Sequence, residues 1–181
     1  NTNLDINIAD MDADGNIYFV VYGYMNRGEH EGKNGMSLYY YSAENMTTQE
    51  LFFVECDESY DIMKKETGRF TYYNAQTNKF YYLLDETLYE VSLADMTQTA
   101  LVEGIPSAKY FVSANRKLVA YPNNAEDEQV TAITIQNFET GETYEKTCAS
   151  GDLLLALGFV ENDLIYGCAH SADVIMTSDG Q

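Results

Sequence analysis

Short runs of apolar and aromatic residues alternate with polar turns along the whole chain. A typical run is Phe80-Tyr81-Tyr82-Leu83-Leu84, which follows Thr77-Asn78-Lys79 and precedes Asp85-Glu86. Runs of about four to eight such residues between Asn, Asp and Gly are typical of β-strands joined by hairpin turns. Several runs are apolar at consecutive positions rather than alternating, which indicates that both faces of the sheet are covered. The pattern therefore predicts an all-β protein built of stacked sheets.

The chain also repeats itself at a constant offset. Leu38–Thr47 (LYYYSAENMT) and Leu88–Thr97 (LYEVSLADMT) match at Leu, Tyr, Ser, Met and Thr, with a shift of 50 residues. A looser third copy begins at Ile133. A self-similar period of about 40–50 residues is typical of β-propeller blades or similar arrays. A β-sandwich is the alternative architecture, but it does not explain the repeat.

We therefore predict a single β-propeller-like repeat domain over residues 1–181, an array of about four four-stranded antiparallel blades. The expected blades span about residues 1–58, 59–105, 106–150 and 151–181. The segment Tyr60–Glu66 is interpreted as a polar connection rather than a helix. The fourth blade lacks an outer strand, so we expect the ring to be incomplete in this chain, or completed by missing blades or a second copy. The expected strands are Leu4–Met11, Ile17–Met25, Met36–Ser42, Glu50–Cys56, Arg69–Asn74, Phe80–Leu84, Thr87–Leu93, Thr99–Glu103, Lys109–Ser113, Leu118–Tyr121, Val130–Asn137, Thr143–Cys148, Leu153–Val160, Leu164–Cys168 and Val174–Thr177.

Composition excludes some classes of function. The net charge is −19, from 29 acidic and 10 basic residues. Such a field repels phosphate backbones and anionic lipids, so we expect no nucleic-acid binding. The longest apolar run, Leu153–Val160, is far shorter than the roughly 20 residues that a transmembrane helix needs. We expect no transmembrane segment in this chain.

No motif for catalysis or cofactor binding stands out. The sequence has no G-x-S-x-G, H-E-x-x-H, Walker or G-x-G-x-x-G pattern. We therefore expect no cofactor and favour a protein that is not an enzyme. A glycan-acting or other hydrolase, whose acids converge only in three dimensions, stays open as an alternative. A set of blades that supports another domain is a further alternative.

The three cysteines are Cys56, Cys148 and Cys168, an odd number without a C-x-x-C pair. This spacing does not suggest a zinc site. Three buried free thiols is the favoured interpretation, and a Cys148–Cys168 disulfide is the alternative.

One stretch, Asp10–Gly15 (DMDADG), has the D-x-D-x-D-G spacing of a calcium loop. Asp10, Asp12 and Asp14 are therefore weak candidate metal ligands. The positions where further acids are needed hold Tyr18 and Val21 instead. We expect a plain hairpin turn and no metal site.

The most distinctive segment is Asn26–Gly35 (NRGEHEGKNG), which joins two expected strands where the second blade uses only Asp85-Glu86. Loops that carry function on a rigid scaffold are often long and charged, although a solvated hairpin tip is the simpler interpretation. By strand order, the matching loops Asn123–Glu128 and Ala169–Asp173 are expected at the same end of the array. Because acids dominate there, a cationic ligand or a basic protein surface fits best. The candidate binding residues are Arg27, Glu29, His30, Glu31, Glu126, Asp127, His170 and Asp173.

Gly23–Gly32 (GYMNRGEHEG), Leu157-Gly158-Phe159 and Asp163–Gly167 (DLIYG) resemble segments of exported proteins of clostridia-type Firmicutes. Those uncharacterised proteins look like secreted or membrane-anchored propellers, and lipoproteins are expected among them. The resemblance covers most of the chain and implies an extracytoplasmic location and a longer bacterial parent protein. It assigns no activity, so the expected function is an extracytoplasmic module that binds a ligand or a protein.

Overall fold

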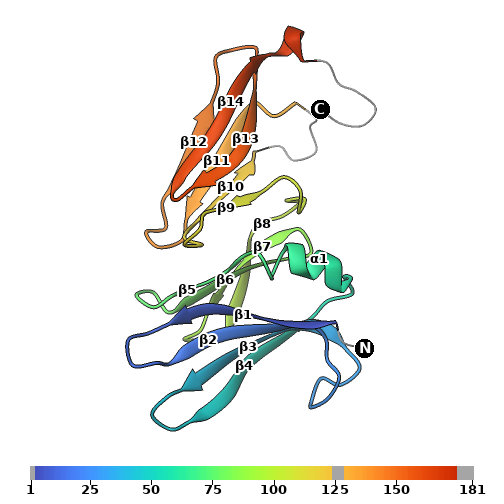
Figure 1. Ribbon diagram of the computed structural model, residues 1–181, viewed down its shortest axis with the longest axis vertical. Helices are drawn as coiled ribbons and strands as arrows, with labels where there is room; N and C mark the ends of the chain where they lie inside the picture. Colours follow the sequence, from blue (N-terminus) through green and yellow to red (C-terminus); the bar gives the residue numbers. More distant parts are fainter. Residues whose placement is uncertain (1–2, 124–128, 175–181) are drawn as a thin grey trace. The chain divides into compact units, whose positions relative to one another are not determined.

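A computed structural model describes residues 3–123 and 129–174 of the chain. It is nearly all-β and has a β-propeller-like fold of antiparallel sheets. Figure 1 shows the strands of each sheet. Three sheets are four-stranded meanders and the fourth has two strands within the described residues. The first sheet contains β1 (Leu4–Met11), β2 (Ile17–Tyr24), β3 (Asn34–Ser42) and β4 (Thr47–Glu55), and the second contains β5 (Thr71–Asn74), β6 (Lys79–Leu84), β7 (Thr87–Ser92) and β8 (Thr97–Val102). The third contains β9 (Phe111–Val112), β10 (Leu118–Pro122), β11 (Ala132–Asn137) and β12 (Thr143–Thr147), and the fourth contains β13 (Asp152–Val160) and β14 (Asp163–His170).

The chain divides into two compact units, Asn1–Glu103 and Gly104–Gln181, and each is described by itself. The first unit holds the first two sheets, and the second unit holds the other two. The prediction of repeated antiparallel blades is confirmed, although the described part of the fourth blade is shorter than expected.

The 50-residue repeat extends to irregular details of the backbone. The pairing of β3 with β4 shifts register between Leu38 and Tyr39, and the pairing of β7 with β8 shifts between Leu88 and Tyr89. Leu38 and Leu88 are both fully buried. Met46 and Met96, in the turns that follow, both adopt a positive φ, of 51° and 58°. The sequence match therefore reflects two copies of the same folded unit.

The core of the first unit lies between its two sheets. Apolar side chains from both sheets form one buried cluster, and Val20 and Leu38 of the first sheet pack there with Phe80 and Tyr82 of the second. The consecutive apolar residues of β6 are explained by this arrangement, because Phe80, Tyr81, Tyr82, Leu83 and Leu84 are all buried. The second unit repeats the design on a smaller scale, with Leu154 of β13 packed among residues of β10 and β11.

The cysteine prediction needs correction. Cys148 and Cys168 form a disulfide, and Cys56 is a buried free thiol. Three free thiols was the wrong choice, and the alternative pairing is confirmed. The physical reason is tertiary: the two-stranded sheet packs on the third sheet, so the residue that follows β12 meets Cys168 on β14.

The segment interpreted as a polar connection contains a short helix, α1 (Tyr60–Lys65). Ser59 caps its N-terminus by accepting a hydrogen bond from the Ile62 N–H, and Met63 is fully buried. An N-cap serine and one buried apolar side chain are enough to hold a helix of six residues in tertiary context. The interpretation as a simple connection was therefore wrong.

The ends of several strands also differ from expectation. β4 begins at Thr47 rather than Glu50, and β9 is reduced to Phe111–Val112. Val174 lies in no strand, and the rest of the expected strand Val174–Thr177 falls outside the described residues. A 3₁₀ turn, η1 (Ser171–Asp173), follows β14. No helix in residues 3–123 or 129–174 is long and apolar enough to span a membrane.

Candidate binding loop of the first unit

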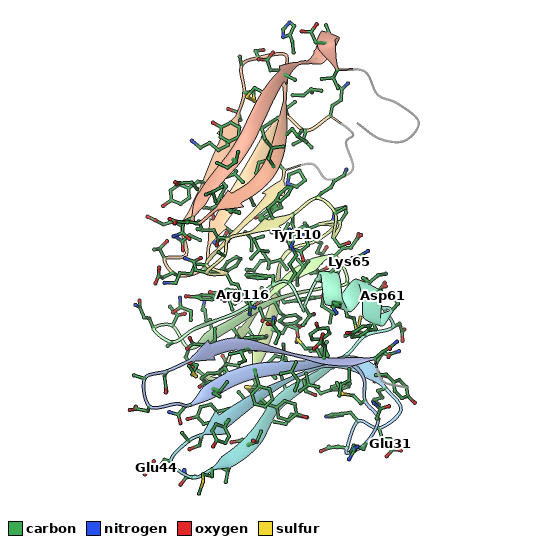
Figure 2. All side chains as sticks on the ribbon, in the orientation of Figure 1. Glu31, Glu44, Asp61, Lys65, Tyr110 and Arg116 are labelled. Carbon is green, nitrogen blue, oxygen red and sulfur yellow. A yellow bond between two sulfur atoms is a disulfide. The ribbon has the colours of Figure 1, made fainter. Side chains whose placement is uncertain are left out.

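The loop between β2 and β3 contains four of the predicted binding residues and is tied together by its own backbone. The Met25 N–H donates to Lys33 O (2.8 Å) and the Gly32 N–H donates to Met25 O (2.9 Å), which closes the loop at its base. Gly28 and Gly32 have φ values of 92° and 90°, a conformation that residues with a Cβ rarely adopt. The glycine-rich composition therefore serves a defined loop shape. Figure 2 shows Glu31 at the outer side of this loop.

His30 anchors the loop to the first sheet. Its Nε2 lies 2.6 Å from Glu50 Oε1, and its ring stacks on Phe53 with centroids 3.9 Å apart and an interplanar angle of 10°. The Tyr39 hydroxyl donates to the other Glu50 oxygen at 2.7 Å. A single carboxylate on β4 is therefore held by a loop histidine and a β3 tyrosine.

The electrostatics of Glu50 follow from these contacts. Partial burial favours the neutral carboxyl, but hydrogen bonds from His30 and Tyr39 outweigh burial and hold the pKa of Glu50 below its usual value. Ser37 lies close enough to this carboxylate to lower its pKa further. The Ser37 hydroxyl makes no hydrogen bond of normal geometry within the described residues. The arrangement favours an ionised Glu50 beside His30.

Lys33 supplies a second anchor at the end of the loop. Its Nζ lies 2.7 Å from Glu55 Oε2, and it also lies 5.9 Å from the centroid of the Phe53 ring. Both partners are about half exposed, so the pair contributes little stability by itself. Its main effect is to fix where the loop rejoins the sheet.

Three predicted residues remain at the outer side of the loop. Arg27, Glu29 and Glu31 are exposed, and no ion pair or side-chain hydrogen bond involves them in the part of the chain that the structure describes. His30 differs from them, because its imidazole is committed to Glu50 and Phe53. The structure therefore separates an anchor residue from three residues available to a partner.

The other predicted residues lie elsewhere or outside the described residues. His170, the last residue of β14, pairs through Nδ1 with Asp152, its register partner on β13. Asp173 ends η1. Both belong to the second unit, whose placement relative to the loop is not described. Glu126 and Asp127 fall outside the described residues.

Glu66 is a buried carboxylate that the sequence did not reveal. Its side chain is fully buried and accepts hydrogen bonds from the backbone N–H groups of Asp85 (2.8 Å) and Glu86 (3.1 Å). Both turn residues have a positive φ, 51° and 54°, so the carboxylate stabilises a tight β6–β7 turn. Burial raises the pKa of Glu66 despite these two bonds.

The candidate calcium stretch forms a turn. Asp12 Oδ1 accepts the backbone N–H groups of Asp14 and Asn16, both at 2.9 Å, and Asp12 Oδ2 accepts Asn16 Nδ2 at 2.8 Å. These bonds, the Asn16 amide foremost, lower the pKa of Asp12. No group of three or more His, Cys, Asp or Glu side chains arranged to hold a metal occurs in residues 3–123 and 129–174.

The role of Glu50 could have been found by comparing the two copies of the repeat. Tyr39 and Tyr89 are equivalent in the 50-residue repeat, but Tyr39 faces Glu50 where Tyr89 faces Ala100. The long loop likewise stands where the second blade has only the turn Asp85-Glu86. Two departures from the repeat thus meet at one place, and comparing the copies position by position would have found them.

Comparisons with known proteins add little. No protein-family model and no curated protein matches the sequence. Among solved structures, the chain is similar to the tricorn protease, with 13% identity over 81% of this chain and 13% of that chain and a TM-score of 0.42. It is also similar to an oligogalacturonate lyase from Vibrio parahaemolyticus, with 12% identity over 98% of this chain and 58% of that chain and a TM-score of 0.37. The chain thus spans less than two thirds of each, and with scores this low neither similarity bears on function.

Proposed function

We propose that this chain is an extracytoplasmic binding module without catalytic activity of its own, and that it takes a basic protein surface on the β2–β3 loop. The proposal rests on one observation: some charged residues of the loop anchor it to the sheet, while others are exposed. His30 and Lys33 hold it on the sheet through Glu50 and Glu55, while Glu29 and Glu31 are exposed and unpaired within the described residues.

A loop held in one shape binds at lower entropic cost than a loose one. The backbone bonds between Met25 and Gly32 or Lys33, and the stack of His30 on Phe53, supply that order before any partner arrives. The net charge of −19 adds long-range attraction for a basic partner and speeds encounter. Arg27 supplies one group that can pair with an acid on the partner and so fix its orientation.

The disulfide supports the proposed location. Disulfides form and persist in secreted, periplasmic and cell-surface proteins, and they are rare in the reducing cytosol of mesophiles. Cys148 and Cys168 are brought together by the packing of two sheets in the second unit. An extracytoplasmic location is consistent with that pair.

The test uses a basic peptide of eight lysines as probe and measures its affinity by isothermal titration calorimetry. Replacing both Glu29 and Glu31 by Gln is expected to weaken binding about tenfold, because two local ion pairs are lost. The matched control replaces Glu161, in the β13–β14 turn, and Asp163, the first residue of β14, with the corresponding amides. Because the control removes the same charge, an equal loss of affinity in both variants would show that only the overall field attracts the peptide.

A second variant, His30→Ala, tests the role of the anchor. It keeps every exposed charge of the loop but removes the contacts to Glu50 and Phe53. We expect weaker binding of the same peptide with an unchanged fold by circular dichroism, because an unanchored loop must be ordered on binding. Unchanged affinity would show that the loop is not the binding surface.

A further inference from the structure

A second feature of the first unit lies at the opposite end of the first sheet from the binding loop. Figure 2 shows Glu44 at this end and Glu31 at the other. Here a hollow of about 510 Å³ opens between the β1–β2 turn and the β3–β4 turn. Its lining residues are Asp14, Asn16, Tyr40, Ser42, Ala43 and Glu44. Hollows of this size fall within the range of small-molecule sites.

One hydrogen bond joins the two turns that form the walls of the hollow, and another holds the first turn. Asn16 donates its amide N–H to Asp12 and accepts the Ala43 backbone N–H through Oδ1 at 3.0 Å. The Tyr40 ring packs against Tyr18 with centroids 5.0 Å apart, and Tyr18 stacks in turn on Tyr73 at 3.9 Å. The hollow therefore has a preformed shape with an aromatic side.

Two lining carboxylates are left without partners. Asp14 and Glu44 are exposed, and in the described residues no ion pair or side-chain hydrogen bond involves either carboxylate. The sequence has no Lys or Arg in residues 1–26 or 34–63, so neither turn supplies a positive charge of its own. Burial raises the pKa of Tyr18 most, and the nearby carboxylates of Asp12 and Asp10 raise it further.

We propose that this hollow binds an alkylammonium group, with Asp14 and Glu44 on either side of the cation and the Tyr40 ring against its alkyl stem. Aromatic rings beside acids favour organic cations through cation–π attraction and charge together. A hard metal ion fits less well, because it needs about six to eight oxygen ligands and Asp12 and Asn16 are already engaged with each other. An anion is excluded by the two carboxylates.

The probe for a free amine is spermidine, and its binding is followed by nuclear magnetic resonance of the backbone amides and by calorimetry. Shifts centred on residues 14–16 and 40–44 are expected. The variant that combines Asp14→Asn with Glu44→Gln is expected to bind spermidine about tenfold more weakly, and Tyr40→Leu about threefold. Of the three substituted residues, Asp14 and Glu44 are exposed and Tyr40 is partly buried. Circular dichroism checks that each variant is folded.

The matched control is the variant that combines Glu161→Gln with Asp163→Asn, which removes the same charge from another turn. Equal weakening in both double variants, or the absence of shifts at the hollow, would overturn the proposal. A second arm uses a short peptide with one central lysine and no other charged side chain, which presents the same ammonium group on a polypeptide. Tighter binding of spermidine than of the peptide indicates a small-molecule site, and the reverse indicates a docking site for a partner's lysine. Because the loop residues 27–33 are unchanged in every variant, failure here leaves the proposed loop function untouched.

Discussion

At the scale of single residues, two carboxylates of the first unit experience opposite environments. Glu66 is sealed among backbone groups, and burial raises its pKa. Glu50 is partly exposed and receives hydrogen bonds from His30 and Tyr39, which lower its pKa. The difference between them is the balance between loss of water and gain of donors.

The first prediction is that replacing Glu66 by Gln changes how stability depends on pH. Because the folded-state pKa lies above the unfolded value, the folded protein holds this proton more tightly, and its contribution to stability is lost as the pH rises through the folded pKa. Glu66→Gln stays uncharged, so its free energy of unfolding should rise relative to the wild type over that range. Urea unfolding at a series of pH values measures this.

Glu50→Gln is the matched control, and its pH dependence should have the opposite sign. The folded-state pKa of Glu50 is lowered, so its contribution is present above the unfolded pKa of about 4.3 and is lost as the pH falls through the folded pKa. The free energy of unfolding of the wild type should therefore rise relative to that of Glu50→Gln as the pH rises. If both variants changed in the same direction, the assignment of the two environments would be wrong.

Residue-scale chemistry was the part least predictable from the sequence. His30 was identified as a binding residue, but its partners Glu50 and Phe53 lie 20 and 23 positions away on another strand. The burial of Glu66 depends on how the β6–β7 turn packs on the segment after α1, which no local pattern encodes. The Cys148–Cys168 pair was open for the same reason, because only the packing of two sheets decides it.

At the scale of elements, Asn7 is the polar link between the first two sheets. From β1 its Nδ2 donates to Thr71 Oγ1 at 2.9 Å and to the carbonyls of Gly68 and Thr67 at 3.2 and 3.4 Å. Asn7 and Thr71 are both buried. The amide therefore satisfies acceptors that water does not easily reach, just where the second sheet begins.

The second prediction is that Asn7→Ala lowers the free energy of unfolding by about 1–3 kcal/mol, because buried acceptors lose their donor. The comparison is Ile8→Ala, which changes the next residue of the same strand. Ile8 is 54% exposed, so this substitution should cost about 0.5 kcal/mol or less. Chemical denaturation of both variants measures the difference, and equal losses would contradict the role given to Asn7.

Strands and turns were more predictable than side-chain contacts, because the repeat shows the same pattern of strands and turns twice. The turn at Thr77-Asn78-Lys79 was located from its residues, and Asn78 indeed has a positive φ. Strand ends were less certain, because the residues at the start of β4 are polar and exposed and carry no burial signal. Helix α1 was missed because six residues are too short for a helical periodicity to show.

A third prediction concerns the disulfide that joins the two sheets of the second unit. Unfolded, unreduced protein should show one reactive thiol per chain, Cys56, and reduction should expose all three. The double variant Cys148→Ser and Cys168→Ser should lose about 3 kcal/mol of stability, as expected for a loop of this length. Hydrogen exchange should localise the loss to β9–β14. Three thiols before reduction would show that the pair does not form.

At the scale of the whole molecule, the dominant feature is the excess of acid. The net charge of −19 destabilises the compact state by self-repulsion and leaves only a minority of the acids with a basic partner. The Lys–carboxylate pairs within residues 3–123 and 129–174 include Lys33 with Glu55, Lys64 with Asp5, Lys79 with Glu90 and Lys117 with Glu139. Their side chains are 22–57% exposed, and ion pairs near the surface contribute about 0.2–1 kcal/mol each.

The last prediction compares the repulsion among the acidic residues with the attraction within the ion pairs. Added salt weakens both, since the screening length falls from about 30 Å at 0.01 M to about 3 Å at 1 M ionic strength. Because the 29 acidic residues far outnumber the 10 basic ones, repulsion exceeds the attraction within ion pairs, and we expect sodium chloride to stabilise the fold at neutral pH. A rise of about 2–4 °C in the midpoint of thermal unfolding corresponds to about 1 kcal/mol for a chain of this size. Near the isoelectric point of about 4.1, where net charge is small, the same salt should change the midpoint little. A midpoint that falls with salt at neutral pH would mean that the ion pairs outweigh the repulsion.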